Sequence, residues 1–172
     1  METLQSVTEI LNQRGRELPL RPKTLWDEEL SEKIKDLPNS ELAREDAPHW
    51  GADALRSALL LWNDDLYASH ELSQKIEQPT GSFLHGVMHR REGDFSNANY
   101  WFRRAGVHEI YPELNKHASE HLPDFNKSAW DPVAFVEEVE KATSQKDAVL
   151  IVKCQEVQRI EMDLIIQYIR TL

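Results

Sequence analysis

Two histidines four residues apart are the residues of this sequence best placed to do chemistry. His85 and His89 fall on one face of a predicted helix, with Cβ atoms about 6 Å apart, and Glu92 follows three residues later. His70, in the preceding apolar helix, can supply a third nitrogen, which leaves Glu92 or Asp94 as fourth ligand or base. This set predicts a divalent metal site, such as one for zinc, formed by His70, His85, His89 and Glu92.

The same helix also permits a purely structural interpretation. Leu84, Val87 and Met88 can form the buried stripe instead, which would turn both histidines toward solvent or into hydrogen bonds with the backbone. The motif differs from HExxH because a glycine follows the first histidine, so the general base of that protease signature is missing. The sequence alone leaves both interpretations open.

Arginines and aromatic residues nearby predict a site for an anion or a small molecule. Adjacent helical residues point about 100° apart, so one arginine from each of two Arg-Arg pairs can form a clamp on a carboxylate or phosphate. In the alternative interpretation, the arginines pair with the abundant acidic side chains. The candidate ligand-binding residues are Arg90, Arg91, Asn97, Tyr100, Trp101, Arg103, Arg104 and His108. No catalytic residue is assigned.

The charge of this region differs from that of the rest of the chain. Residues 70–108 contain 4 of the 7 histidines and have a net charge of +1, whereas the remainder carries -11. Burying unpaired imidazole or guanidinium groups costs several kcal/mol, about 2–7 for a neutral polar group and more for a charge. The region therefore predicts either a central binding pocket or an internal polar network that serves structure alone.

Residues 86–105 resemble one tetratricopeptide unit, in which small residues let two antiparallel helices approach and aromatic residues fill the space between them. The matching positions are Gly86, Gly93, Phe95, Ala98, Phe102 and Ala105. No second copy follows at the repeat spacing, and solenoids need several units, so we expect a single hairpin within a bundle. The resemblance implies the alternative function, a helical protein-interaction module without catalytic activity.

The segments HRREGD at 89–94 and YWFRR at 100–104 carry a second resemblance. Together with Ser69 and His70, they are similar to an uncharacterised bacterial and fungal group of helical proteins. The resemblance covers about a third of the chain. It implies a helical fold and no particular activity.

Hydrophobic periodicity predicts an all-α fold, a helical bundle with a central antiparallel hairpin, as one domain over residues 1–172. The stripe of Leu55, Leu59, Trp62 and Leu66 predicts one long helix. Residues 107–130 form a polar region interrupted by Pro112 and Pro123, and no helix is assigned there. Helices are expected over 2–14 (ended by Gly15), 25–37 (capped by Thr24), 52–76, 81–92 (capped by Thr80), 95–105 (capped by Asp94 or Ser96), 132–142 and 146–170, with one short turn within 39–48.

Composition excludes several classes of protein. With 40% hydrophobic and 29% charged residues and a net charge of -10, the 172-residue chain is expected to be globular and to bind neither nucleic acid nor anionic membranes. No signal peptide or membrane span is predicted, and Cys154 has no partner for an internal disulfide, so we expect a cytoplasmic protein. The wide apolar face of residues 146–170 must be covered by the bundle or by a second copy in a homodimer.

Overall fold

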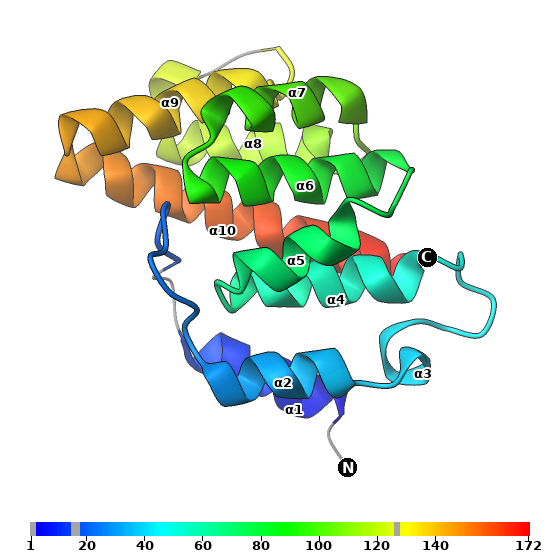
Figure 1. Ribbon diagram of the computed structural model, residues 1–172. Coiled ribbons are helices and arrows are strands. Elements are labelled where there is room, and N and C mark those ends of the chain that lie inside the picture. Colours follow the sequence, from blue (N-terminus) through cyan, green and yellow to red (C-terminus); the bar gives the residue numbers. More distant parts are fainter. Residues whose placement is uncertain (1–2, 15–17, 126–127) are drawn as a thin grey trace.

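The computed structural model describes residues 3–14, 18–125 and 128–172, and the regular structure in these ranges is entirely helical (Figure 1). The predicted all-α class is therefore confirmed. The helices are α1 (Leu4–Gln13), α2 (Glu28–Asp36), α3 (Asn39–Leu42), α4 (Gly51–Trp62), α5 (Leu66–Ser73), α6 (Pro79–Glu92), α7 (Phe95–Ala105), α8 (Tyr111–His121), the 3-10 turn η1 (Pro123–Phe125), α9 (Pro132–Gln145) and α10 (Ala148–Thr171).

The longest helix, α10, runs across the molecule and packs against α4, α8 and α9 (Figure 1). The hairpin of α6 and α7 lies on one side of it, with α5 beneath α6, and α1 and α2 form the opposite end. On the apolar face of α10, Cys154, Val157 and Ile165 are fully inaccessible within the bundle, whereas Leu150 and Leu164 are only partly buried. No helix of the described residues is both long and apolar enough to cross a membrane.

The first two helices begin at capping residues that anchor their free N–H groups. Thr3 caps α1 and accepts a hydrogen bond from the backbone of Ser6. The cap of α2 is Asp27, which accepts from the Leu30 N–H, so the expected cap at Thr24 is wrong by three residues. The expected start of the first helix at Glu2 and its end at Gly15 lie outside the described residues.

The predicted long helix over 52–76 is two helices, and the break has a tertiary cause. Asn63, Asp64 and Asp65 separate α4 from α5, and Asp64 adopts a left-handed backbone conformation with φ of 62°. The Asp64 carboxylate accepts hydrogen bonds from Arg14 and Arg91, while Asp65 caps α5. The break folds α5 back against α4 and α6, which moves His70 away from the α4 stripe.

A helix also forms where the prolines suggested an interruption. In α8, Pro112 occupies the first turn, where a proline removes no helical hydrogen bond. Tyr111, Leu114 and Ala118 follow at i, i+3 and i+7 and are buried against the bundle. Most of the polar residues between them face outward, so a helix forms in a segment to which the sequence pattern assigned none.

The hairpin of α6 and α7 is the element that carries most candidate site residues. Gly93 ends α6 with φ of 90°, a conformation that favours glycine, and Asp94 caps α7 by accepting from the Asn97 N–H. The two helices touch closely at Gly86, where a Cβ atom would lie 2.9 Å from the Phe102 ring. The expected cap at Thr80 is replaced by Gln78 with Pro79 in the first turn.

Candidate functional site

Three histidines from two helices lie together at the edge of the hairpin. The ring centroids of His85 and His89 on α6 are 4.7 Å apart, and His70 on α5 lies 4.7 Å from His85 and 5.6 Å from His89. One nitrogen from each ring lies within 4.8 Å of the other two. We call this group the histidine cluster. The break between α4 and α5 is what positions its third member.

His85 is the most enclosed member of the cluster. The residue is 2% exposed, and neither ring nitrogen has a hydrogen-bond partner among the described residues. Its ring stacks on Trp101 of α7. Burial, together with the charges that His89 and His70 can carry, lowers the pKa of His85 to about 3. The imidazole is therefore neutral at physiological pH, the form in which it binds metals.

His89 is oriented by a carboxylate from the next turn of its own helix. Its Nδ1 lies 2.6 Å from Oε1 of Glu92, whose side chain is 42% exposed. A neutral His89 that donates its Nδ1–H to Glu92 keeps a lone pair on Nε2 for another partner. This arrangement of carboxylate and imidazole is the one that orients histidine ligands in metal sites.

The four predicted metal ligands do not form a single cluster. Glu92 groups with His89 and Asp94 and not with His70 and His85, and its carboxylate contacts Nδ1 of His89. Asp94 already accepts two hydrogen bonds from Asn97 as the cap of α7, and these bonds lower its pKa. The predicted role of Glu92 as fourth ligand or base is thus replaced by contact with His89.

The arginines of α6 do not form the predicted anion clamp. Arg90 and Arg91 are both fully buried, although the clamp required at least one of them to face a ligand. Arg90 makes a two-pronged ion pair with Glu161 of α10, at 2.5 and 3.1 Å, and its guanidinium lies 4.7 Å from the centre of the Phe135 ring. These contacts engage both terminal nitrogens of the guanidinium, while its buried Nε has no partner among the described residues. Arg90 therefore does not face a ligand, so this part of the prediction is wrong.

Arg91 is held in the second buried ion-pair network. It donates to Asp64 at 2.5 Å and to the carbonyl oxygens of Leu61 and Pro19. Burial lowers its pKa to about 10, against the opposing effect of Asp64. Arg90 and Arg91 therefore face paired charges inside the bundle, as the structural interpretation of the sequence expected, and not a ligand shared with Arg103 or Arg104.

The remaining predicted ligand residues are dispersed. Arg103 and Arg104 are exposed on α7, with Arg104 5.5 Å over the Trp101 ring, and Tyr100 is 54% exposed. Asn97 is exposed and donates to Asp94. His108 is buried elsewhere, where its Nε2 lies 3.1 Å from the Thr80 hydroxyl. Of the eight predicted ligand residues, Trp101 is the one whose ring stacks on a member of the histidine cluster, His85.

The geometry stands without support from known proteins. No protein-family model, no curated protein and no solved structure matches this chain. The resemblances to a tetratricopeptide unit and to the helical group with the HRREGD and YWFRR segments therefore stay predictions.

Sequence reasoning missed the partners of the buried arginines. Glu161 lies on the core side of α10 and is 0% exposed, and Asp64 was assigned to the middle of a long helix. One signal was present, because Glu161 interrupts the apolar face of the last helix between Val157 and Ile165. An acidic residue on such a face requires a buried cation.

Proposed function

We propose that the protein binds one divalent transition-metal ion, zinc being the best fit, through His70, His85 and His89. The observation that carries the proposal is the state of His85, a buried imidazole with two unpaired nitrogens between two other histidines. A buried polar group without a partner costs about 1–3 kcal/mol, which a metal ligand bond would offset. The solvent-exposed edge of His70, whose side chain is 31% accessible, offers an entry route.

The donor set supports a transition metal over magnesium or calcium. Three imidazole nitrogens suit zinc, copper, nickel and cobalt, whereas magnesium and calcium require oxygen ligands. Three protein ligands also leave one tetrahedral position for water, as in catalytic zinc sites. Because Glu92 is engaged with His89, a hydrolytic reaction at this site would need its base from elsewhere. We therefore propose metal binding and assign no reaction.

Binding requires a small rearrangement of the rings. Zinc–nitrogen bonds of about 2.0–2.1 Å place tetrahedral ligand atoms about 3.4 Å apart, so the nitrogens must approach by about 1 Å. The rings of His85 and His89 are inclined by only 16°, and parallel rings direct their lone pairs side by side. One ring must turn about χ2. Glu92 holds His89, so we expect His85 to turn.

The test is metal content and affinity in protein purified without a histidine tag. Elemental analysis should find up to one zinc per chain, and isothermal titration of metal-free protein with zinc should give one site. His85→Ala and His89→Ala should each weaken binding at least about tenfold. Circular dichroism of each variant checks that the fold is retained.

The chain contains its own control for a histidine pair at this spacing. His117 and His121 also lie four residues apart, on α8, and His117 is engaged by Glu113 at 2.8 Å. Replacing both with alanine should leave zinc affinity unchanged. The proposal would be contradicted if the α8 double variant lost as much zinc affinity as the α6 variants. It would also be contradicted if folded wild-type protein showed no saturable zinc binding.

A further inference from the structure

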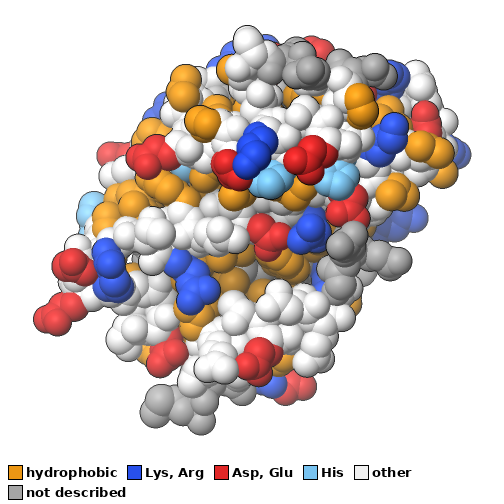
Figure 2. All heavy atoms as spheres, turned by 180° about the vertical axis from the view of Figure 1, so that it is seen from behind, with side chains coloured by type: hydrophobic (Ala, Val, Ile, Leu, Met, Phe, Trp, Pro, Cys, Tyr) orange, Lys and Arg blue, Asp and Glu red, His pale blue; other side chains and the backbone are white. Residues whose placement is uncertain are grey.

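A groove lies between α1 and the second half of α10. Two cavities that share Arg170 adjoin there, with volumes of about 240 and 210 Å3. Leu4 lines the first and Leu11 the second, so the two cavities follow one another along α1. Seen from behind, hydrophobic side chains lie at the bottom of a hollow between the part of the molecule with α10 and the part with α1 (Figure 2). We call this feature the α1–α10 groove.

The walls and floor of the groove come from three helices. Leu4, Thr8 and Leu11 line it from α1 at i, i+4 and i+7, the spacing of one helical face. Asp163, Ile166 and Arg170 line it from α10 at i, i+3 and i+7. Leu59 and Trp62 of α4 contribute to the second cavity, between the two walls. Two helices that flank a third in this way form a groove in which an added helix can pack, as in a helical bundle.

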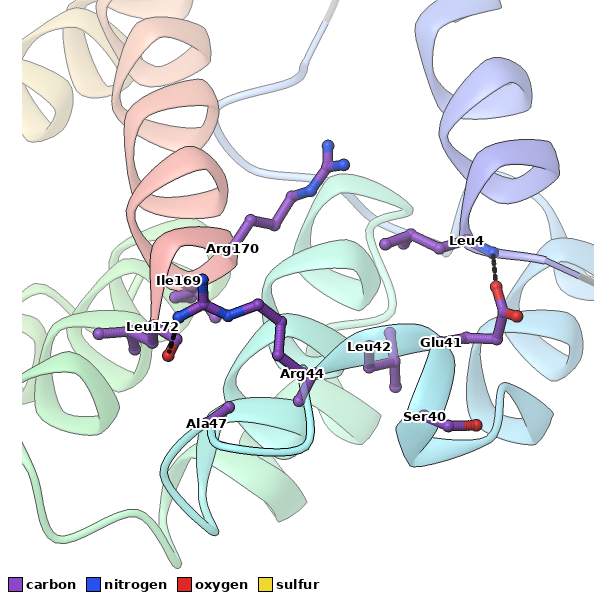
Figure 3. A pocket seen from close by; sticks show the side chains of 11 residues that line it. Leu4, Ser40, Glu41, Leu42, Arg44, Ala47, Ile169, Arg170 and Leu172 are labelled. Carbon is purple, nitrogen blue, oxygen red and sulfur yellow. Dashed lines mark hydrogen bonds between the residues drawn. The ribbon is translucent and has the colours of Figure 1, made fainter.

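Most charged side chains in the groove have partners. Asp163 accepts from Arg159 at 2.7 Å, and the Glu41 carboxylate accepts from the backbone N–H of Leu4. Arg44 donates to the carbonyl oxygens of Thr171 and Leu172 at the end of α10. Arg170 lines both the first and the second cavity, and within the described part of the chain its guanidinium has no hydrogen-bond or ion-pair partner. Figure 3 shows Arg170 extending toward the space beside α1, while Arg44 turns to the end of α10.

From this arrangement we propose that the α1–α10 groove binds an amphipathic helix of a partner protein that presents a carboxylate to Arg170. Apolar side chains on either side of that carboxylate would enter the first and second cavities. Leu4 and Leu11 are separated by about 10 Å along α1, so the two anchors are one to two turns apart on the partner helix. The single free cation between two cavities supplies the charge complementarity that selects an acidic helix.

The lining favours a peptide over a lipid-like ligand. Asn12 and Gln167 place exposed amide groups along the second cavity, which suit the polar edges of a helix. The Thr8 hydroxyl beside them donates to the carbonyl oxygens of Leu4 and Gln5. A fatty-acid chain would make no hydrogen bond to the two amides. The proposal is independent of the histidine cluster, which lies on the hairpin.

The experiment is selection from a phage-displayed library of helical peptides about 15 residues long, randomised on one face, against the full chain. Selected sequences should carry Asp or Glu flanked by apolar residues at helical spacing. A synthetic peptide of the selected sequence should lose at least about tenfold in affinity to Arg170→Glu. Replacing its acidic residue with Lys should restore binding to that variant. Asn12→Trp, which fills the second cavity from an exposed position, should also weaken binding.

Arg103→Glu is the matched control, since Arg103 is an exposed arginine on the distant helix α7. It should leave peptide affinity unchanged. Failure to enrich any peptide, binding that is insensitive to both groove variants, or enrichment without acidic residues would overturn the proposal. So would a dimer in light scattering that Asn12→Trp dissociates, because the groove would then be occupied by a second copy of the chain.

Discussion

The ring of His85 stacks on the indole of Trp101, with centroids 3.9 Å apart and planes inclined by 18°. The contact joins α6 to α7 at the histidine cluster and gives the proposed metal site a spectroscopic reporter. A ring that turns to bind a metal must change this stack.

Copper(II) or nickel(II) added to metal-free protein should quench part of the tryptophan fluorescence. The quenched part should belong to Trp101, because the other four tryptophans do not stack on the cluster among the described ring contacts. Trp101→Phe should retain metal binding by titration calorimetry and lose the quenching. Quenching that persists in this variant would place the metal elsewhere.

Glu92→Gln should weaken zinc binding about 10- to 100-fold, because the amide is a weaker acceptor for the Nδ1–H of His89 and reduces the basicity of the imidazole. Glu71→Gln is the control. Its carboxylate lies 3.8 Å from Nδ1 of His70, beyond hydrogen-bond distance, so little change is expected. If both substitutions weaken zinc binding equally, the effect comes from the negative charge of the carboxylates and not from the hydrogen bond between Glu92 and His89.

The stability of metal-free protein should fall as the pH falls below about 6.5. The unfolded chain binds a proton on His85 near its ordinary pKa, whereas burial delays protonation of the folded chain to a pKa of about 3. The contribution is fully present above the unfolded pKa and is lost between these values, with a slope of at most about 1.4 kcal/mol per pH unit. Urea unfolding in the presence of a chelator should show a smaller slope for His85→Leu than for wild type. His117→Leu, at a partly exposed position, should not reduce it.

Arg90→Met should destabilise the fold by about 3–5 kcal/mol, because it leaves the fully buried Glu161 without its cation. The double variant Arg90→Met/Glu161→Leu removes both charges and should recover most of this loss. Urea unfolding of the two variants measures the difference. A double variant as unstable as the single one would mean that shape, rather than charge, dominates at this position.

Gly86→Ala should destabilise the hairpin, because the added Cβ would lie 2.9 Å from the Phe102 ring, which must shift at a cost of about 1–3 kcal/mol. Gly51→Ala is the control. Its added methyl group would meet only Ala47 at 3.8 Å, so the better helix propensity of alanine should stabilise α4 slightly. Thermal unfolding should rank the Gly86 variant below wild type and the Gly51 variant at or above it.

The all-α class, the hairpin with its turn at Gly93 and Asp94, and the shared face of His85 and His89 could all be predicted from the sequence. Each depends on residues that are only a few positions apart. Examples are helical periodicity, a capping side chain that accepts from the N–H three residues later, and a glycine with positive φ. The burial of Cys154 also followed from its place on an apolar stripe. Local rules of this kind need no knowledge of the rest of the chain.

Tertiary structure decided the break at Asp64, the burial of Arg90 and Arg91, the approach of His70 to the other histidines and the groove beside Arg170. In each case the partner is distant in sequence: Arg91 donates to Asp64, and Arg90 pairs with Glu161. The periodicity of residues 52–76 favoured a continuous helix, but Arg14 and the buried Arg91 both pair with Asp64 at the break between α4 and α5. The free energy of pairing a buried charge exceeds the small local preference for helix, so the fold overrode the local pattern at that point.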